Sequence, residues 1–258
     1  MDLVGFFNRE IPAFRLALQF LTRLPVTAPF SAEAMRQSPR WYPAVGIVVG
    51  ALAGLVFVLG DWVLTPQLAV FLAVATAVIV TGALHEDGFA DACDGLGGVR
   101  PKERVLEIMR DSRIGAYGVL GLIFMIGTKG LALSSMPATD VFFVLIAGHT
   151  ASRAAMVWVM ASSDYVREKG AGSAVAGGID RTALVVALIT TALALLPLVF
   201  CVRLDAILCG LCGLVLAQFL MRRWYEPRLG GYTGDCLGAV QQCSEVGFYL
   251  GLLVVIGA

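Results

Sequence analysis

The stretch "VATAVIVTGALHEDGFADACDGLGG" (Val74–Gly98) guides the interpretation of the whole chain. Its first part carries no charge, whereas the part from His85 onward gathers four carboxylates and one of the chain's two histidines within fourteen residues. An uncharged run of this kind is typical of a membrane helix. The sequence therefore predicts a helix that crosses a lipid bilayer and ends in a concentrated acidic segment.

Composition extends this prediction to the whole chain. The 258 residues are 58% hydrophobic and only 15% charged, against about 25% charged residues in a typical soluble domain, and the mean hydropathy is +0.82. The formal net charge is zero, so no broad basic surface indicates a nucleic-acid partner. Cys209 and Cys212 form a CxxC pair, but it lies inside an apolar run and indicates membrane packing. We expect one all-α integral-membrane domain over residues 1–258.

Seven apolar segments approach the roughly 20 residues that a membrane-spanning helix needs. They are Tyr42–Leu64, Pro66–Leu84, Tyr117–Met136, Thr139–Met160, Thr182–Val202, Asp205–Met221 and Leu237–Ala258. The first six form three pairs with very short links, which predicts three helical hairpins.

Residues 1–41 are too polar to span and are expected at the cytoplasmic membrane surface. Apolar side chains recur at helical spacing within them, with polar side chains opposite, which is typical of an amphipathic interfacial helix. The apolar positions are Ile11, Phe14, Leu18 and Leu21, and the polar ones are Arg15 and Gln19.

The basic residues orient the predicted bundle. Sixteen of the 19 Lys and Arg residues lie in residues 1–41, 85–116, 161–181 and 222–236, whereas the opposite-side segments hold only Arg203. Basic residues concentrate in cytoplasmic loops. The chain is therefore predicted to lie in a bacterial inner membrane, with these segments in the cytoplasm and the C-terminus outside.

The acidic segment has the pattern of a metal site. On a helix, Asp87, Asp91 and Asp94 stand at i, i+4 and i+7 and share one face. They repel one another unless a hard divalent cation, which prefers carboxylate oxygens, lies between them. Zinc is disfavoured because His85 and Cys93 are the only softer partners nearby. A solvated acidic loop is the alternative.

The same predicted cytoplasmic loop continues to "MRDSRIGAYGVLGL", where Arg110 and Arg113 flank Asp111. Arginine suits bidentate phosphate contacts, and backbone N–H groups at the start of the next helix favour an anion. Ordinary topology charge is the alternative for both arginines. Glycines permit close approach of a ligand to the backbone. Those expected beside the substrate are Gly95, Gly97, Gly98 and Gly115.

Ionisable residues also occur within predicted spans. His149 and Arg153 stand four apart in one span, and such residues usually face a cavity or a partner. We predict catalytic roles for both, with a buried ion-pair network as the alternative. Lys129 lies at comparable depth, and we favour a structural role for it.

The last polar stretch is "GGYTGDCLGAVQQCSE", residues 230–245. Asp235 follows a glycine-rich turn and is a candidate for a further metal ligand. Gln241, Gln242 and Glu245 fall on neighbouring helical turns and are predicted to bind substrate. A helix start capped by polar residues is the alternative.

Three polar clusters far apart in sequence are thus predicted to meet at one membrane face. Acids, arginines and a divalent metal suit phosphoryl or nucleotidyl transfer, in which the metal neutralises charge on the transferring phosphate. The rival class is a cation-coupled transporter. It would carry acids deep in its spans and on both sides, whereas the acids here are massed at the cytoplasmic mouth.

At these stretches the chain resembles the cobalamin synthase family, also called the adenosylcobinamide-GDP ribazoletransferases. The matching segments, in family order, are "QFLTRLPV" (Gln19–Val26), "HEDGFADACDGLGG" (His85–Gly98), "RDSRIGAYG" (Arg110–Gly118), "GHTASRAAM" (Gly148–Met156) and "YTGDCLGAVQQCSE" (Tyr232–Glu245). The resemblance implies a Mg²⁺-dependent membrane enzyme of late cobalamin assembly. It would join adenosylcobinamide-GDP to α-ribazole or its 5′-phosphate, and release adenosylcobalamin or its phosphate together with GMP. We expect the ribazole 5′ oxygen to attack the phosphorus nearer cobinamide.

A second comparison fits only in part. CDP-alcohol phosphotransferases carry a DxxDGxxAR signature, and Asp91, Asp94 and Gly95 fit its DxxDG portion. The Ala-Arg pair is absent, since Gly98 and Val99 stand there. We therefore expect analogous chemistry rather than membership of that family. The general base, either His85 or a spare aspartate, and a homo-oligomeric state are left open.

Overall fold

The computed structural model describes residues 3–167, 175 and 179–257, and of residues 3–8 the backbone only. The helices are α1 Leu3–Leu21, α2 Ala32–Gln37, α3 Tyr42–Asp61, α4 Pro66–Thr81, α5 Leu84–Leu96, α6 Lys102–Ile108, α7 Ala116–Ser134, α8 Ala138–Ser162, α9 Arg181–Leu195, α10 Leu204–Leu229 and α11 Gly234–Ile256. Short 3₁₀ helices cover Ser38–Trp41 and Leu196–Phe200.

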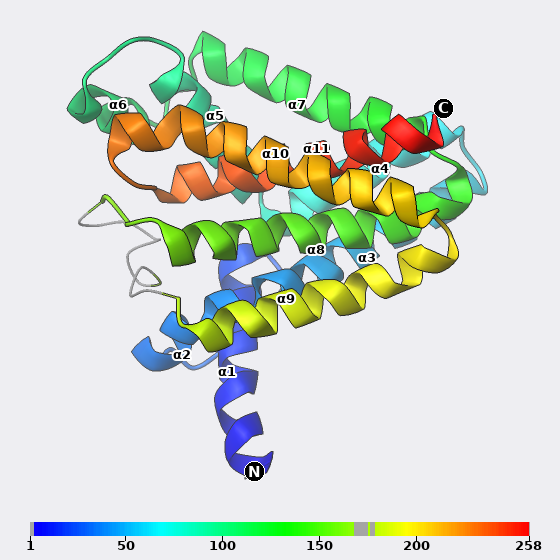
Figure 1. Ribbon diagram of the computed structural model, residues 1–258, viewed down its shortest axis with the longest axis horizontal. Coiled ribbons are helices and arrows are strands. Elements are labelled where there is room, and N and C mark those ends of the chain that lie inside the picture. Colours follow the sequence, from blue (N-terminus) through cyan, green and yellow to red (C-terminus); the bar gives the residue numbers. More distant parts are fainter. Residues whose placement is uncertain (1–2, 168–174, 176–178, 258) are drawn as a thin grey trace.

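The all-α membrane bundle is confirmed. Among the described residues, six helical segments are long and apolar enough to cross a membrane, namely the one ending in α3 and helices α7 to α11. Helices α4 and α5 meet this criterion only as a pair, which gives a seventh span if they are counted together. The spanning helices run side by side, while α2, α5 and α6 gather at one end of the bundle (Figure 1).

A sharp bend separates α4 from α5. The prediction of one segment over Pro66–Leu84 is wrong in detail, because α4 ends at Thr81 and α5 leaves it at 89°. Gly82 and Ala83 have φ values of 64° and 58°, in the left-handed region that ends helices. We therefore treat α5, with its four carboxylates and His85, as a helix that lies across the end of the bundle, outside the spanning segments.

Helix α10 is longer than predicted. It continues to Leu229, beyond the expected end at Met221. Arg222 and Glu226 form an i,i+4 ion pair that supports the added turns. The predicted loop over residues 222–236 is therefore mostly helix.

Helix α1 crosses the bundle rather than running along it (Figure 1). Leu18 and Leu21 are buried, whereas Arg15 and Gln19 are exposed, as expected for an amphipathic helix. Ile11 is 51% exposed, so this apolar side chain does not pack into the bundle.

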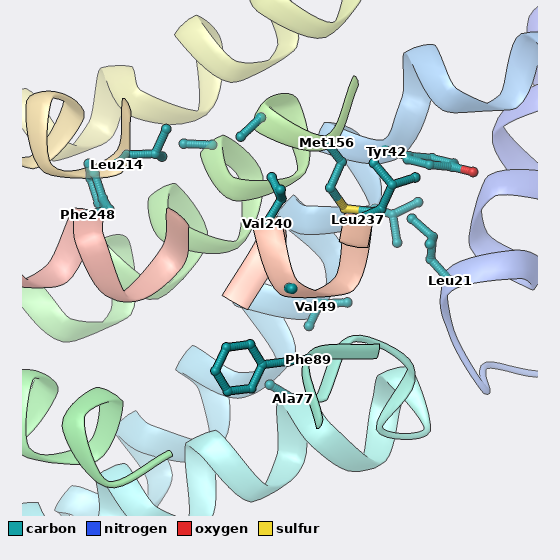
Figure 2. Close-up of a cluster of buried hydrophobic side chains, with 14 of the residues drawn as sticks. Leu21, Tyr42, Val49, Ala77, Phe89, Met156, Leu214, Leu237, Val240 and Phe248 are labelled. Atoms are coloured by element: carbon teal, nitrogen blue, oxygen red, sulfur yellow. The ribbon is translucent and has the colours of Figure 1, made fainter. Parts of the chain in front are cut away.

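Small residues bring the spans close together. A Cβ added to Gly46 of α3 would lie 2.4 Å from the backbone oxygen of His149 in α8, and one added to Gly213 of α10 would lie 2.2 Å from that of Gly247 in α11. Such contacts are typical of membrane helix packing. Figure 2 shows buried side chains of α11, including Val240, at the centre of the core.

The orientation of the bundle gives a first testable prediction. A periplasmic reporter fused to the C-terminus should be active, and one fused within residues 161–181 should be silent, because basic loops stay in the cytoplasm. Reporter activity in intact cells measures this. The reverse pattern would move the acidic end of the bundle outside the cell and contradict the assignment.

Candidate active site

Helix α5 rests directly on the start of α11. A Cβ added to Gly88 would lie 3.0 Å from the Cα atom of Asp235, and one added to Gly238 would lie 2.9 Å from the backbone oxygen of His85. The two backbones therefore touch. This contact brings Asp235 beside the acidic segment, as the sequence predicted.

A cavity opens where these helices meet. Its empty volume is ≈ 710 Å³, open solvent included. The polar side chains that line it are His85, Asp87, Tyr165, Arg167 and Asp235. Acids, a histidine and an arginine from three separate segments thus share one cavity.

The acids beside this cavity carry an excess of negative charge. Burial, followed by the charges of Asp235 and Asp87, raises the pKa of Asp91 to about 7, although Arg167 opposes the shift. Clustered carboxylates of this kind fit a hard divalent cation. Among the described residues, however, no three His, Cys, Asp or Glu groups are already arranged around a common metal position.

His85 differs from the acids in its charge. It is 2% exposed, and its Nε2 atom is buried without a hydrogen-bond partner in the described part of the chain. Burial and the charge of Arg153 hold the pKa of His85 well below its usual range. The imidazole is therefore neutral near pH 7.

Asp94 points to a different partner from the other aspartates. Its carboxylate accepts hydrogen bonds from the backbone N–H of Gly115 at 2.7 Å and of Gly118 at 2.8 Å. Both donors belong to the start of α7, where a helix favours negative charge. The anion expected at this helix start is thus the protein's own Asp94, which joins the end of α5 to α7.

This contact predicts the effect of small changes in α7. A Cβ at Gly118 would lie 2.4 Å from the Asp94 carboxylate. We therefore expect Gly118→Ala and Asp94→Ala each to lower the free energy of unfolding by about 1–3 kcal/mol, through loss of a partly buried, charge-assisted pair of hydrogen bonds. Thermal unfolding in detergent measures this. Gly127→Ala is the control, because the added Cβ meets nothing within 4 Å there. Equal losses of stability in Gly118→Ala and Gly127→Ala would contradict the role of Asp94 as the cap of α7.

The two arginines predicted to hold phosphate lie near the site but do not line the cavity. The Arg113 side chain is 87% exposed and forms an ion pair with Asp111. Hydrogen bonds from Arg113 lower the pKa of Asp111 to about 2. Arg110 is also exposed, and its charge acts on Tyr165 in the cavity wall.

The three glycines predicted on α5 and just after it serve packing. An added Cβ would lie 2.8 Å from Met109 at Gly95, 2.6 Å from Tyr117 at Gly97 and 3.2 Å from Arg100 at Gly98. They do not line the cavity. At these three glycines, other side chains of the protein approach the backbone closely, in the place where a ligand was expected.

Arg167 is the cavity residue that sequence reasoning missed, because it counted only as a topology charge. It pairs with Asp235, and its side chain is 10% exposed. A short bridge holds it there, since the Val166 N–H donates to the Tyr232 oxygen at 3.0 Å and the Tyr232 N–H to the Asp164 oxygen at 2.8 Å. This pairing links segments far apart in sequence, so no local signal reveals it.

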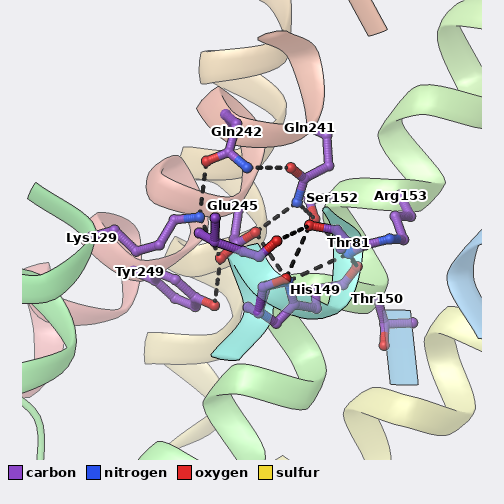
Figure 3. A network of polar contacts seen from close by, with 12 residues as sticks. Thr81, Lys129, His149, Thr150, Ser152, Arg153, Gln241, Gln242, Glu245 and Tyr249 are labelled. Carbon is purple, nitrogen blue, oxygen red and sulfur yellow. Dashed lines mark hydrogen bonds and ion pairs between the residues drawn. The ribbon is translucent and has the colours of Figure 1, made fainter. Parts of the chain in front are cut away.

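A buried polar network joins α7, α8 and α11 (Figure 3). Its centre is Glu245, which is 0% exposed. The Glu245 carboxylate lies 3.0 Å from Lys129 Nζ and 3.1 Å from His149 Nδ1. It also accepts hydrogen bonds from Gln241 Nε2 at 2.6 Å and from the Tyr249 hydroxyl at 3.1 Å.

The network extends to α5 and α8. Gln242 accepts a hydrogen bond from Lys129 at 2.9 Å and donates one to Glu86 at 2.8 Å. Arg153 donates to the backbone oxygen of His149 at 2.9 Å. The structure thus brings together His149 and Arg153 of α8 with Gln241, Gln242 and Glu245 of α11, but as a buried ionic core, because these five residues do not line the cavity.

Fold and site together define a polytopic helical membrane protein with an acid-rich cavity at one end. A family model described as Cobalamin-5-phosphate synthase matches residues 13–253, and the chain belongs to this family. It is therefore an enzyme, a transferase of cobalamin synthesis.

Curated relatives cover nearly the whole chain. Proteins named adenosylcobinamide-GDP ribazoletransferase from Shewanella amazonensis and Leptothrix cholodnii are 39% and 42% identical over 96% and 95% of this chain, and over 97% and 96% of their own lengths. One from Vibrio cholerae is 37% identical over 98% of both chains. No solved structure matches.

Proposed function

We propose that this enzyme joins adenosylcobinamide-GDP to α-ribazole, or to its 5′-phosphate, and releases GMP in a Mg²⁺-dependent reaction on the cytoplasmic side of the inner membrane. The observation that carries the proposal is the match of residues 13–253 to the family. Asp87 of one matched segment and Asp235 of another line the same cavity, which supports a diphosphate site there.

The acids supply the expected ligands for Mg²⁺. Asp87, Asp91 and Asp235 would hold the ion against the donor diphosphate, and Asp94 would contribute least, since both its oxygens already accept hydrogen bonds. When bound, Mg²⁺ would neutralise charge on the diphosphate and on the departing GMP. Arg167 is placed to bind a phosphate oxygen once Asp235 turns to the metal.

The reaction exchanges one phosphorus–oxygen bond for another. A ribose hydroxyl of the acceptor attacks the phosphorus nearer cobinamide, and the bond from that phosphorus to the bridging oxygen of GMP breaks. The hydroxyl cannot be the 5′ one, because an acceptor already phosphorylated there keeps that phosphate in the product. The proton passes to neutral His85 or to a carboxylate beside it.

One assay tests the proposal. Purified protein should release GMP from adenosylcobinamide-GDP only when α-ribazole or its 5′-phosphate and Mg²⁺ are both present, and the corrinoid product should appear in equal amount. Cation movement into liposomes without GMP release would instead support a transporter.

One substitution at each of three basic residues tests which of them contacts a substrate phosphate. Lysine keeps the charge but loses the planar fork. A hydrogen bond to a charged group contributes about 1.5–3 kcal/mol, so Arg167→Lys should lower kcat/KM by about 10- to 150-fold. We expect a smaller effect for Arg113→Lys, because that side chain is paired in an exposed loop, and almost none for Lys102→Ala.

Steady-state kinetics with adenosylcobinamide-GDP varied measures all three variants. If only Arg113→Lys lowered kcat/KM, the arginine that contacts the phosphate would be Arg113, as the sequence predicted, and not Arg167. Equal small effects at all three positions would show that none of these residues forms the bidentate contact.

A further inference from the structure

One wall of the cavity is apolar and the proposed reaction does not use it. Besides Val175, the apolar and aromatic side chains of this part of the lining are Phe20, Leu21, Tyr42, Leu84, Met156 and Leu237, which come from α1, α3, α5, α8 and α11. Figure 2 shows Leu21, Tyr42, Met156 and Leu237 beside one another. The Phe20 and Tyr42 rings lie nearly parallel, with centroids 6.4 Å apart. The cavity therefore has one polar side and one largely apolar, aromatic side.

Two residues of the cavity lining also carry polar atoms without partners. The His85 Nε2 atom is buried and unbonded within the described residues. The Tyr42 hydroxyl is also buried and has only Ser38 nearby, without a hydrogen bond of ordinary geometry. An unpaired buried polar group is costly unless a ligand or water satisfies it. A ligand that combines a flat apolar body with a few hydrogen-bonding atoms would complement both features.

Resting on the proposed function, we infer that this wall is the subsite for the acceptor, a benzimidazole nucleoside, whose ring lies against Tyr42 and Met156 while its ribose faces Asp87 and Asp235. Guanine fits less well, because its polar edge would face side chains that mostly cannot hydrogen-bond with it. The acids and Arg167 on the polar part of the lining would then face the donor diphosphate.

Substitution of Met156 tests the apolar contact. Met156→Phe adds bulk in a buried position that is 4% exposed. We expect the KM for α-ribazole to rise about 10-fold, since overpacking displaces the ring, while the KM for adenosylcobinamide-GDP stays unchanged. Met221→Phe is the matched control, because Met221 is 5% exposed but lines a separate groove.

Substitution of Tyr42 tests the hydrogen bond. Tyr42→Phe removes only the hydroxyl and should raise the KM for α-ribazole by about 2- to 12-fold. Tyr225→Phe is the control, because the Tyr225 hydroxyl is also buried without a partner but does not line the cavity. A change in donor KM, or equal effects at the two tyrosines, would overturn the inference.

Direct binding separates this inference from the proposed reaction. Equilibrium dialysis of labelled α-ribazole against the wild type and Met156→Phe, without donor, needs no turnover. Weaker binding to the variant supports the subsite even if the wild type makes no product. Turnover with unchanged acceptor KM and unchanged binding in both cavity variants would leave the proposed function standing and overturn the subsite.

Discussion

Replacing Asp87 or Asp235 by asparagine is expected to lower kcat/KM for adenosylcobinamide-GDP by about a thousandfold. Each substitution keeps the shape of the side chain but removes a carboxylate that lines the cavity. A metal on a transferring phosphate contributes several kcal/mol of transition-state stabilisation, and about 4 kcal/mol corresponds to a thousandfold in rate. The assay is GMP release at several Mg²⁺ concentrations, which we expect to rescue the variants only in part.

The control for this prediction lies at the opposite end of the bundle. Asp205 is paired with Arg203, and its side chain is 52% exposed. Asp205→Asn should leave kcat/KM within about twofold of the wild type, because exposed ion pairs contribute little. Near-normal turnover of both cavity variants at saturating Mg²⁺ would show that these acids are only a solvated cluster.

Replacing Glu245 by glutamine is expected to lower the free energy of unfolding by about 3–5 kcal/mol. Lys129 would then lose its carboxylate partner in the membrane interior, where the two side chains are 5% and 0% exposed. Removing one partner of a buried ion pair leaves the other charge without compensation. This costs far more stability than replacing both charges by apolar groups. Thermal unfolding in detergent should show a midpoint lower by about 10 °C.

A double variant distinguishes the ion pair from packing. Adding Lys129→Met to Glu245→Gln removes both charges, and we expect it to recover part of the lost stability, as in a double-mutant cycle. Additive losses in the double variant would mean that the pair is not coupled and that the network is held by its other members, such as Gln241 and Tyr249.

The sequence was sufficient for the membrane class because that class depends on local composition. Uncharged runs near 20 residues form helices in lipid wherever they occur, since backbone groups must bond internally. The i, i+4, i+7 spacing likewise placed Asp87 and Asp91 on one helix face without tertiary information. The matching motifs predicted the family, and the near-full-length match confirmed it.

Interactions between separate helices could not be predicted from spacing. Asp94 has the same periodic position as Asp87 and Asp91, yet it caps α7 because the 89° bend aims the end of α5 at that helix. Arg167 looked like one of many cytoplasmic charges until its pairing with Asp235 placed it in the cavity.

The sequence by itself thus determined that this chain is a helical membrane protein with acids, arginines and deep ionisable residues in definite segments. The tertiary structure decided which side chains these residues contact. Glu245, predicted to bind substrate, lies at the centre of the buried ionic network, whereas Asp235 lines the cavity. The physical reason is that helix formation depends on neighbouring residues, whereas the bend at Gly82 and the close approach at Gly88 set which distant side chains meet.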